Sequence, residues 1–198
     1  MIRKRAGVLI SGRGSNMRAL VEAARDPLYP AQIACVVSNK ADAAGLTFAI
    51  ERGIETKVVD HRVYASREAF DAALNAYLQN QNLDLICCAG FMRIMTPVLI
   101  RPWLGRMLNI HPSLLPAYRG LHTHERALAD GAKSHGCTVH FVTDELDSGQ
   151  IVAQAAVPVL PGDTAGTLAA RVLEQEHPLY AKALALVAGG EIQMRTSS

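Results

Sequence analysis

Apolar runs and helical segments alternate along the first half of the chain, and this alternation constrains the fold more than any other feature. The runs at 31–38 and 84–89 are apolar at nearly every position, as expected for strands that are covered on both sides. The alternation places strands at 6–10, 31–38, 54–59, 84–89 and 106–111, with helices at 16–25, 43–52, 66–80 and 97–104. Repeated strand–helix units predict an α/β fold, a single-domain, Rossmann-like open sheet that is mainly parallel and has helices on both faces.

The pattern changes after the fifth predicted strand. The remaining elements are expected at 112–121 (a loop rich in Pro and Gly), 122–131 (a short helix), 136–142 and 150–159 (strands) and 164–187 (a long helix). Pro178 is expected to kink or restart the long helix, because proline has no backbone N–H to donate. No linker or repeat divides the 198 residues, so we expect one domain.

The overall composition limits the classes of partner. A net charge of +2 and an aromatic content of 5% are too low for a nucleic-acid surface. No window approaches the roughly 18 apolar residues that span a membrane. The cysteines lie in apolar runs without C-x-x-C spacing and are expected to be buried; they are Cys35, Cys87, Cys88 and Cys137. We therefore expect a cytoplasmic protein, monomeric or homodimeric, with no nucleic-acid and no membrane partner.

The first predicted strand runs directly into a glycine-rich turn, Ser11-Gly12-Arg13-Gly14-Ser15-Asn16, before a helical stripe that begins at Met17. Backbone N–H groups in such a turn converge on an anion at the positive end of the helix. The dinucleotide fingerprint lacks its third glycine here, which favours a monophosphate over a pyrophosphate as ligand. A tight turn that needs glycine for backbone reasons alone would show the same pattern.

A second candidate site is the run Asn109-Ile110-His111-Pro112 at the end of the fifth predicted strand. Side chains alternate along a strand, so Asn109 and His111 point the same way while Ile110 points into the core. Pro112 ends the strand and keeps His111 extended. A donor amide beside a titratable imidazole suits acyl-group transfer. A histidine with a structural role is the alternative.

The acidic loop at 144–149 joins two predicted strands and therefore belongs on a rim of the sheet. A carboxylate there could orient the imidazole of His111 and raise its pKa. The spacing does not select among Asp144, Glu145 and Asp147. A solvated turn rich in Asp, Ser and Gly is the alternative interpretation.

The remaining histidines are expected to be exposed or structural. His122 and His124 are two residues apart, so they do not share a helical face, and no cysteine cluster completes a metal site. No metal is therefore expected. No partner pattern accompanies His61, His135 or His140.

Taken in order, these motifs resemble the phosphoribosylglycinamide formyltransferase family of folate-dependent enzymes. The resemblance covers nearly the whole chain and rests on the segments 11–16, 38–42, 89–94, 109–116, 120–124, 140–147 and 175–177. The Asn109 run and the Asp147 loop also occur in other formyltetrahydrofolate enzymes, whereas the phosphate turn narrows the resemblance to this family. The chain departs from the family pattern in the loop 116–120 and at Leu173.

The resemblance implies transfer of a formyl group from 10-formyltetrahydrofolate to the amine of glycinamide ribonucleotide, in purine biosynthesis. It implies that His111 is the general acid, that Asn109 holds the tetrahedral oxyanion and that Asp147 raises the pKa of His111. No metal cofactor is implied. The domain would comprise a phosphate-binding half at about 1–105 and a folate-binding and catalytic half at about 84–190.

The resemblance also assigns ligand contacts. Those to glycinamide ribonucleotide would come from Gly14, Ser15, Asn16, Met17 and Arg18 at its phosphate, and from Gly90 and Glu176 at its glycinamide end. Those to the folate would come from Met92, Arg93, Ile94, Met95, Asn109 and Asp144, with Arg67 at its acidic tail.

Other functions stay open at this point. A formyltetrahydrofolate hydrolase would use the same catalytic residues with water as acceptor, although it usually carries an additional amino-terminal domain and this chain starts at its first strand. Methionyl-tRNA formyltransferase is disfavoured, because we expect neither a carboxyl-terminal RNA-binding domain nor a strongly basic face. A non-catalytic nucleotide-binding module would bind ligand without turnover, and a metal-dependent hydrolase would lose activity on chelation.

Overall fold

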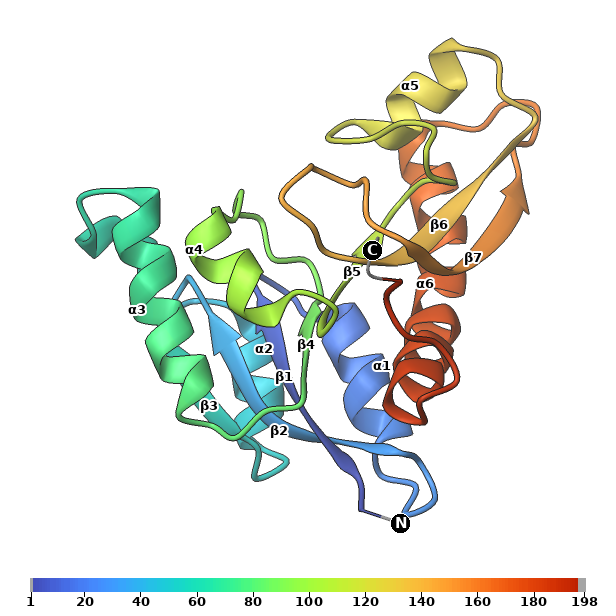
Figure 1. The fold of residues 1–198 in the computed structure, drawn as a ribbon. Helices are drawn as coiled ribbons and strands as arrows, with labels where there is room; N and C mark the ends of the chain where they lie inside the picture. Colours follow the sequence, from blue (N-terminus) through green and yellow to red (C-terminus); the bar gives the residue numbers. More distant parts are fainter. Residues whose placement is uncertain (1, 196–198) are drawn as a thin grey trace.

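A seven-stranded sheet with helices on both faces forms the fold (Figure 1). The computed structural model describes residues 2–195. The strands are β1 (Lys4–Ile10), β2 (Ala31–Ser38), β3 (Glu55–Val58), β4 (Leu85–Cys88), β5 (Met107–His111), β6 (Ser134–Phe141) and β7 (Ile151–Pro158). The helices are α1 (Ser15–Ala23), α2 (Ala44–Ile50), α3 (Arg67–Gln79), α4 (Pro97–Ile100), α5 (Thr123–Ala129) and α6 (Ala165–Ala188), with 3-10 helices η1 (His61–Val63) and η2 (Arg101–Trp103).

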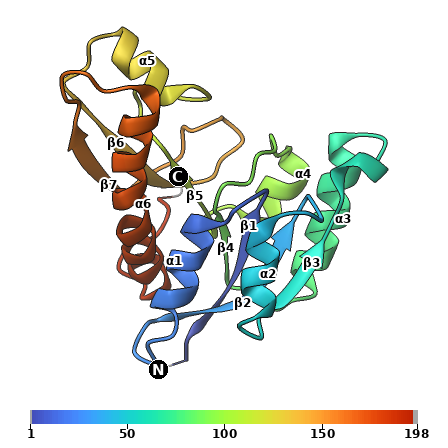
Figure 2. The same cartoon turned by 180° about the vertical axis from the view of Figure 1, so that it is seen from behind.

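The strand order is β3-β2-β1-β4-β5-β6-β7. The pairs from β3 to β5 are parallel, and only the pairs β5–β6 and β6–β7 are antiparallel. The prediction of a mainly parallel, Rossmann-like α/β sheet is therefore confirmed. Helices α1, α2 and α6 cover the face that is toward the viewer in Figure 2, and α3 and α4 cover the other.

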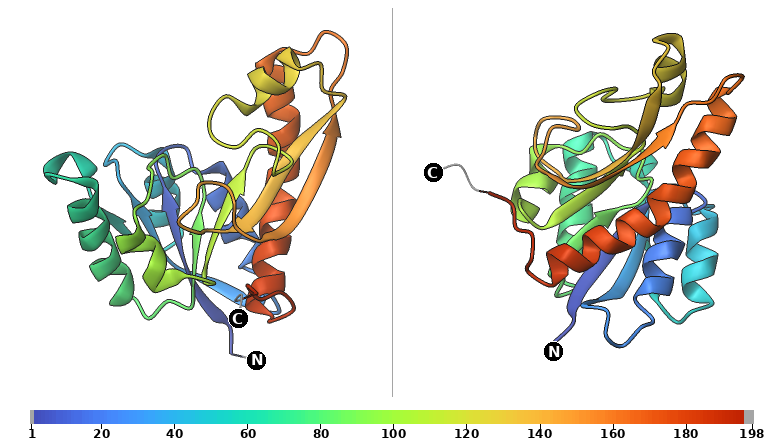
Figure 3. Two further views of the ribbon diagram at one scale, coloured as in Figure 1. Left: turned by 45° about the horizontal axis from the view of Figure 1, so that its top comes forward. Right: turned by 90° about the vertical axis from the view of Figure 1, so that its right-hand side faces the viewer.

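The strand order places the candidate residues at one edge of the sheet. The chain leaves β1 toward β2 on one side, and β4 pairs with β1 on the other, which makes the β1–β4 boundary a topological switch point. Ligands of open α/β sheets bind outside the carboxyl ends of the strands at such a point. The segments that follow β1, β4 and β5 all begin at this edge, which can be followed in Figure 3.

Proline falls within two of the predicted helices, with different outcomes. The helix expected at 97–104 is split into α4 and η2, because Pro102 within η2 has no N–H to continue the helical ladder. The long helix neither stops nor restarts at Pro178, since α6 is assigned as one continuous helix. Leu179, Tyr180 and Leu184 of α6 are buried in the core, and this packing offsets the lost hydrogen bond.

The prediction that the cysteines are buried is confirmed for all four. Burial raises the pKa of Cys35 to about 11 and that of Cys137 to about 12, so neither thiol is reactive near neutral pH. Of the helices described, none combines the length and the apolar character needed to cross a bilayer.

Candidate active site

The glycine turn ends β1 and starts α1 through Gly14, which is the N-cap residue in a left-handed conformation with φ of 69°. A Cβ at Gly14 would lie 2.9 Å from Met17 Cε and 3.3 Å from the backbone Cα of Gly45. Both the left-handed conformation and this lack of space favour glycine at the position. No side chain caps the helix, and its first-turn N–H groups have no intrahelical acceptor. The turn can therefore present Ser15 and Asn16 N–H groups to an anion.

The structure limits what two of the predicted phosphate contacts can do. Met17 is fully buried, so its side chain belongs to the core and only its backbone can face a ligand. The Arg18 guanidinium lies 4.7 Å from the centre of the Phe48 ring, which directs this side chain along α2.

Asn16 joins the turn to the long helix α6. Its Nδ2 donates to Glu176 Oε2 at 2.6 Å, and both residues are buried. The Oδ1 atom of Asn16 is buried without a protein partner. Burial raises the pKa of Glu176, although the bond from Asn16 opposes that shift. Glu176 therefore lies beside the glycine turn.

Ser11 connects the turn to the segment that follows β4. Its N–H donates to the Gly90 carbonyl at 3.1 Å, and its hydroxyl accepts the N–H of Met92 at 2.8 Å. The same hydroxyl donates to Asn39 Oδ1 at 2.6 Å. Gly90 has a φ of 77° and open space where a Cβ would be. The predicted positions Gly90 and Met92 are thus brought next to the glycine turn.

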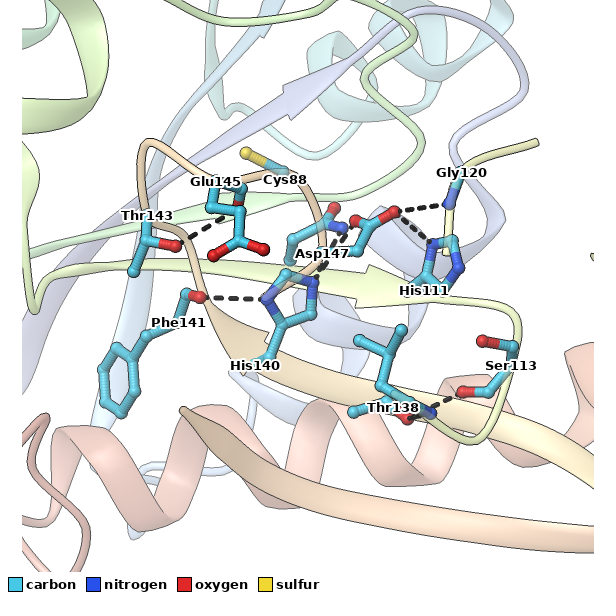
Figure 4. Close-up of polar contacts among 12 residues, drawn as sticks. Cys88, His111, Ser113, Gly120, Thr138, His140, Phe141, Thr143, Glu145 and Asp147 are labelled. Carbon is cyan, nitrogen blue, oxygen red and sulfur yellow. Dashed lines mark hydrogen bonds and ion pairs between the residues drawn. The ribbon is translucent and has the colours of Figure 1, made fainter. Parts of the chain in front are cut away.

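His111 is buried at the end of β5, with both ring nitrogens facing acceptors. Figure 4 shows the side of the ring that faces Asp147. Nε2 lies 2.9 Å from the Tyr118 carbonyl oxygen, and Nδ1 lies 3.4 Å from Asp147 Oδ2. A carbonyl only accepts hydrogen bonds, so Nε2 carries a hydrogen in this arrangement. Asp147 Oδ2 also accepts the N–H of Gly120 at 2.9 Å, which fixes the carboxylate beside the ring.

The geometry selects one of the three acidic residues that the sequence left open. Asp144 pairs with Arg101 at 3.2 Å and Glu145 pairs with Arg119 at 2.9 Å, and both carboxylates are exposed. Only Asp147 is buried against His111. The expectation that a carboxylate of this loop reaches His111 is borne out by the distance.

His140 was missed by the sequence analysis. It is the register partner of Asn109 across β5 and β6, and its Nε2 lies 3.3 Å from Asn109 Nδ2. The same nitrogen lies 3.7 Å from Asp147 Oδ1. Burial lowers the pKa of His140. Only the pairing of β5 with β6 brings His140 to Asn109, and the periodicity of the sequence does not predict which strands pair.

Most of the predicted folate contacts lie on the loop between β4 and α4, with Arg67 on α3, Asn109 on β5 and Asp144 on the loop between β6 and β7. Met92 and Ile94 are 73% and 60% exposed, which leaves an apolar surface free on this loop. Arg93 lies 5.7 Å from the centre of the Phe70 ring of α3. Arg67 is exposed at the first turn of α3. Met95 is half-buried against the core cluster that contains Phe70.

His122 and His124 have different surroundings. His124 Nδ1 lies 3.1 Å from His135 Nε2, and His122 is the N-cap residue of α5. Burial lowers the pKa of His135 to about 4. Within residues 2–195 there is no group of three or more His, Cys, Asp or Glu side chains that could hold a metal ion.

A buried His–Asp pair, a neighbouring carboxamide and a glycine-rich turn on one edge of an α/β sheet agree with the comparisons with known proteins. The family model described as formyl transferase matches residues 4–184, so the chain belongs to the formyl transferase family. The phosphoribosylglycinamide formyltransferase of Escherichia coli K12 is 45% identical over 191 residues, which is 96% of this chain and 90% of that protein.

Solved structures show the same fold. The phosphoribosylglycinamide formyltransferase from Brucella melitensis superposes with a TM-score of 0.90 at 53% identity, covering 98% of this chain and all of that one. Glycinamide ribonucleotide transformylase 1 from Symbiobacterium toebii gives a TM-score of 0.92 at 47% identity, covering 95% and 89% of the two chains.

Longer relatives contain the same region. The human trifunctional purine biosynthetic protein adenosine-3 is 50% identical over 190 residues, which is 96% of this chain. The chain spans only 19% of the length of that relative.

Proposed function

We propose that this chain is a phosphoribosylglycinamide formyltransferase of purine biosynthesis. It transfers the formyl group of 10-formyltetrahydrofolate to the amine of glycinamide ribonucleotide, and these two small molecules are its partners. The observation that carries the proposal is the buried His111–Asp147 pair, 3.4 Å apart, at the same sheet edge as the glycine turn of α1.

The roles of the catalytic residues follow from the charge that the reaction develops. Attack of the amine on the formyl carbon places negative charge on the formyl oxygen, and an N–H of the Asn109 carboxamide would stabilise it. The departing folate nitrogen needs a proton, which His111 would supply as general acid. Asp147 would orient the imidazole and stabilise its protonated form.

The ligand contacts divide between the two halves of the domain, at about 1–105 and about 84–190. The turn Gly14-Ser15-Asn16 would bind the phosphate mainly through backbone N–H groups, with Met17 contributing its backbone and Arg18 adjoining. Gly90 and Glu176 would face the glycinamide end. The folate would lie along Met92, Arg93, Ile94 and Met95 and beside Asn109 and Asp144, with Arg67 at its acidic tail.

Deformylation of the folate tests this function directly. The purified chain would be given 10-formyltetrahydrofolate with and without glycinamide ribonucleotide, and folate deformylation would be followed. We expect turnover only when the ribonucleotide is present, with formylated ribonucleotide as the product. Deformylation without the ribonucleotide would identify a hydrolase instead, and loss of activity after chelation would identify a metal-dependent enzyme.

A further inference from the structure

His140 lies where β6 is irregular. Its side chain is 3% exposed, and it faces Asn109 across the antiparallel pairing of β5 with β6. On its other side, the register of β6 with β7 shifts between Val139 and His140. Such bulges are often found next to active sites, where they redirect a side chain. The strand geometry therefore aims an imidazole at the amide of Asn109.

The hydrogen bonds of His140 determine which ring nitrogen carries the hydrogen. Nδ1 lies 2.9 Å from the carbonyl oxygen of Phe141, which can only accept, so Nδ1 is the donor. Burial lowers the pKa of His140 and so favours the neutral ring, against the opposing effects of the Phe141 carbonyl and Asp147. In the neutral ring with a hydrogen on Nδ1, Nε2 presents a lone pair.

That lone pair discriminates between the two ends of the Asn109 carboxamide. Nδ2 of Asn109 lies 3.3 Å from His140 Nε2 and can donate to it, whereas Oδ1 in the same place would face a lone pair. One hydrogen of Nδ2 is used by His140, and the second stays available. A carboxamide turned the other way would direct its oxygen at the oxyanion and repel it.

We propose that His140 is a positioning residue that holds the Asn109 carboxamide with its N–H side toward the reacting formyl group. The inference rests on the proposed function, in which Asn109 donates to the oxyanion. His140 could instead act through Asp147, because Asp147 Oδ1 lies 3.7 Å from the same Nε2. A lone pair at Nε2 donates no hydrogen bond to that carboxylate, so the geometry favours Asn109.

A double-mutant cycle distinguishes whether His140 acts through Asn109 or through Asp147. We expect His140→Leu, which removes the acceptor, to lower kcat by about 10-fold, and the same change in an Asn109→Ala background to lower it by less than about 2-fold. His140→Gln keeps an acceptor oxygen near the position of Nε2, and we expect it to recover kcat to within about 3-fold of wild type. An equal loss of kcat in the wild-type and Asn109→Ala backgrounds overturns the proposal. The proposal also fails if the effect of His140→Leu depends on Asp147→Asn and not on Asn109→Ala.

The matched control is His135→Leu, because His135 lies on the same strand and is equally buried but bonds to His124. Melting temperatures of all variants report the general cost of replacing a buried histidine on β6. We expect the His135 variant to keep kcat within about 2-fold of wild type. A loss as large as that of His140→Leu would mean that any buried imidazole on this strand matters, which contradicts a specific role.

A readout that does not depend on activity is the nitrogen NMR spectrum of the His140 imidazole in the unliganded wild-type protein. We expect a protonated Nδ1 and a lone pair at Nε2. A hydrogen on Nε2 overturns the proposal. If the wild-type chain showed no formyl transfer that depends on the ribonucleotide, the proposed function would fail, while this spectrum would still report how His140 and Asn109 are arranged.

Discussion

The glycine turn and the His111 centre share one edge of the sheet but are built in opposite ways. The turn is built from backbone: Gly14 has a left-handed conformation, and no side chain caps the first N–H groups of α1. The centre works through side chains: the imidazole of His111 and the carboxylate of Asp147 are each 8% exposed. We therefore expect the centre to be sensitive to side-chain identity and the turn to be sensitive to the presence of a Cβ.

Replacing His111 is expected to have the largest effect. His111→Ala removes the proposed acid, and we expect kcat to fall by about 10²-fold or more, with a smaller change in the KM for the ribonucleotide. Steady-state kinetics with both substrates measure the changes in kcat and in KM separately. His61→Ala is the matched histidine control, because His61 bonds to Asn39 instead of to a carboxylate of the centre. Unchanged turnover of the His111 variant would remove the proposed acid role.

The second effect concerns the carboxylate. Asp147→Asn keeps an oxygen that can accept the Gly120 N–H but removes the negative charge beside His111. The charge that would hold and orient the proposed acid is lost, so we expect kcat to fall by about 10-fold in steady-state kinetics. Glu145→Gln, in the same loop but paired with Arg119, is the control. An unchanged kcat in the Asp147 variant contradicts the proposed role of the pair.

These two regions also differ in how much of them the sequence predicts. The turn is local: a strand, two glycines and a helix follow each other, so its backbone geometry can be predicted from neighbours in the chain. Asn109 and His111 are predictable for the same reason, since strand alternation places them on one face. The parallel sheet follows from the repeated strand–helix units.

The contacts that complete the centre are not local. His111 meets Asp147 from a loop beyond β6, and Asn109 meets His140 through a strand register that depends on the bulge in β6. Asp144 and Asp147 are alike in the sequence, and only the fold pairs the first with Arg101 and buries the second. Tertiary packing likewise carries α6 through Pro178.

Gly14→Ala tests the role of the backbone in the glycine turn. The new Cβ would lie 2.9 Å from Met17 Cε and would force a residue with a side chain into the left-handed region. We expect the KM for glycinamide ribonucleotide to rise by about 10-fold with kcat nearly unchanged, and stability to fall by about 1–2 kcal/mol.

Gly12→Ala is the control for Gly14→Ala, because nothing lies within 4 Å of a Cβ at Gly12. The unphosphorylated analogue of the ribonucleotide separates two causes. We expect its binding to be the same in wild type and in the Gly14 variant. An equal loss for both ligands would mean that the turn has a structural role and does not bind the phosphate.

Glu176 extends from α6 to Asn16 in the turn, and its replacement gives the smallest effect. Burial raises the pKa of Glu176, so the folded state favours the protonated acid, and ionisation costs stability as the pH rises through that pKa. Glu176→Gln keeps an acceptor for Asn16 without the charge. We expect it to increase the free energy of unfolding by about 1 kcal/mol at pH 8 and by almost nothing near pH 4, where both side chains are neutral.

Urea unfolding at the two pH values measures the difference, with exposed Glu174→Gln as the control. A gain independent of pH would show that packing and not charge is responsible. A gain at pH 8 together with weaker ribonucleotide binding would indicate that this buried carboxylate is kept for the substrate amine at a cost in stability.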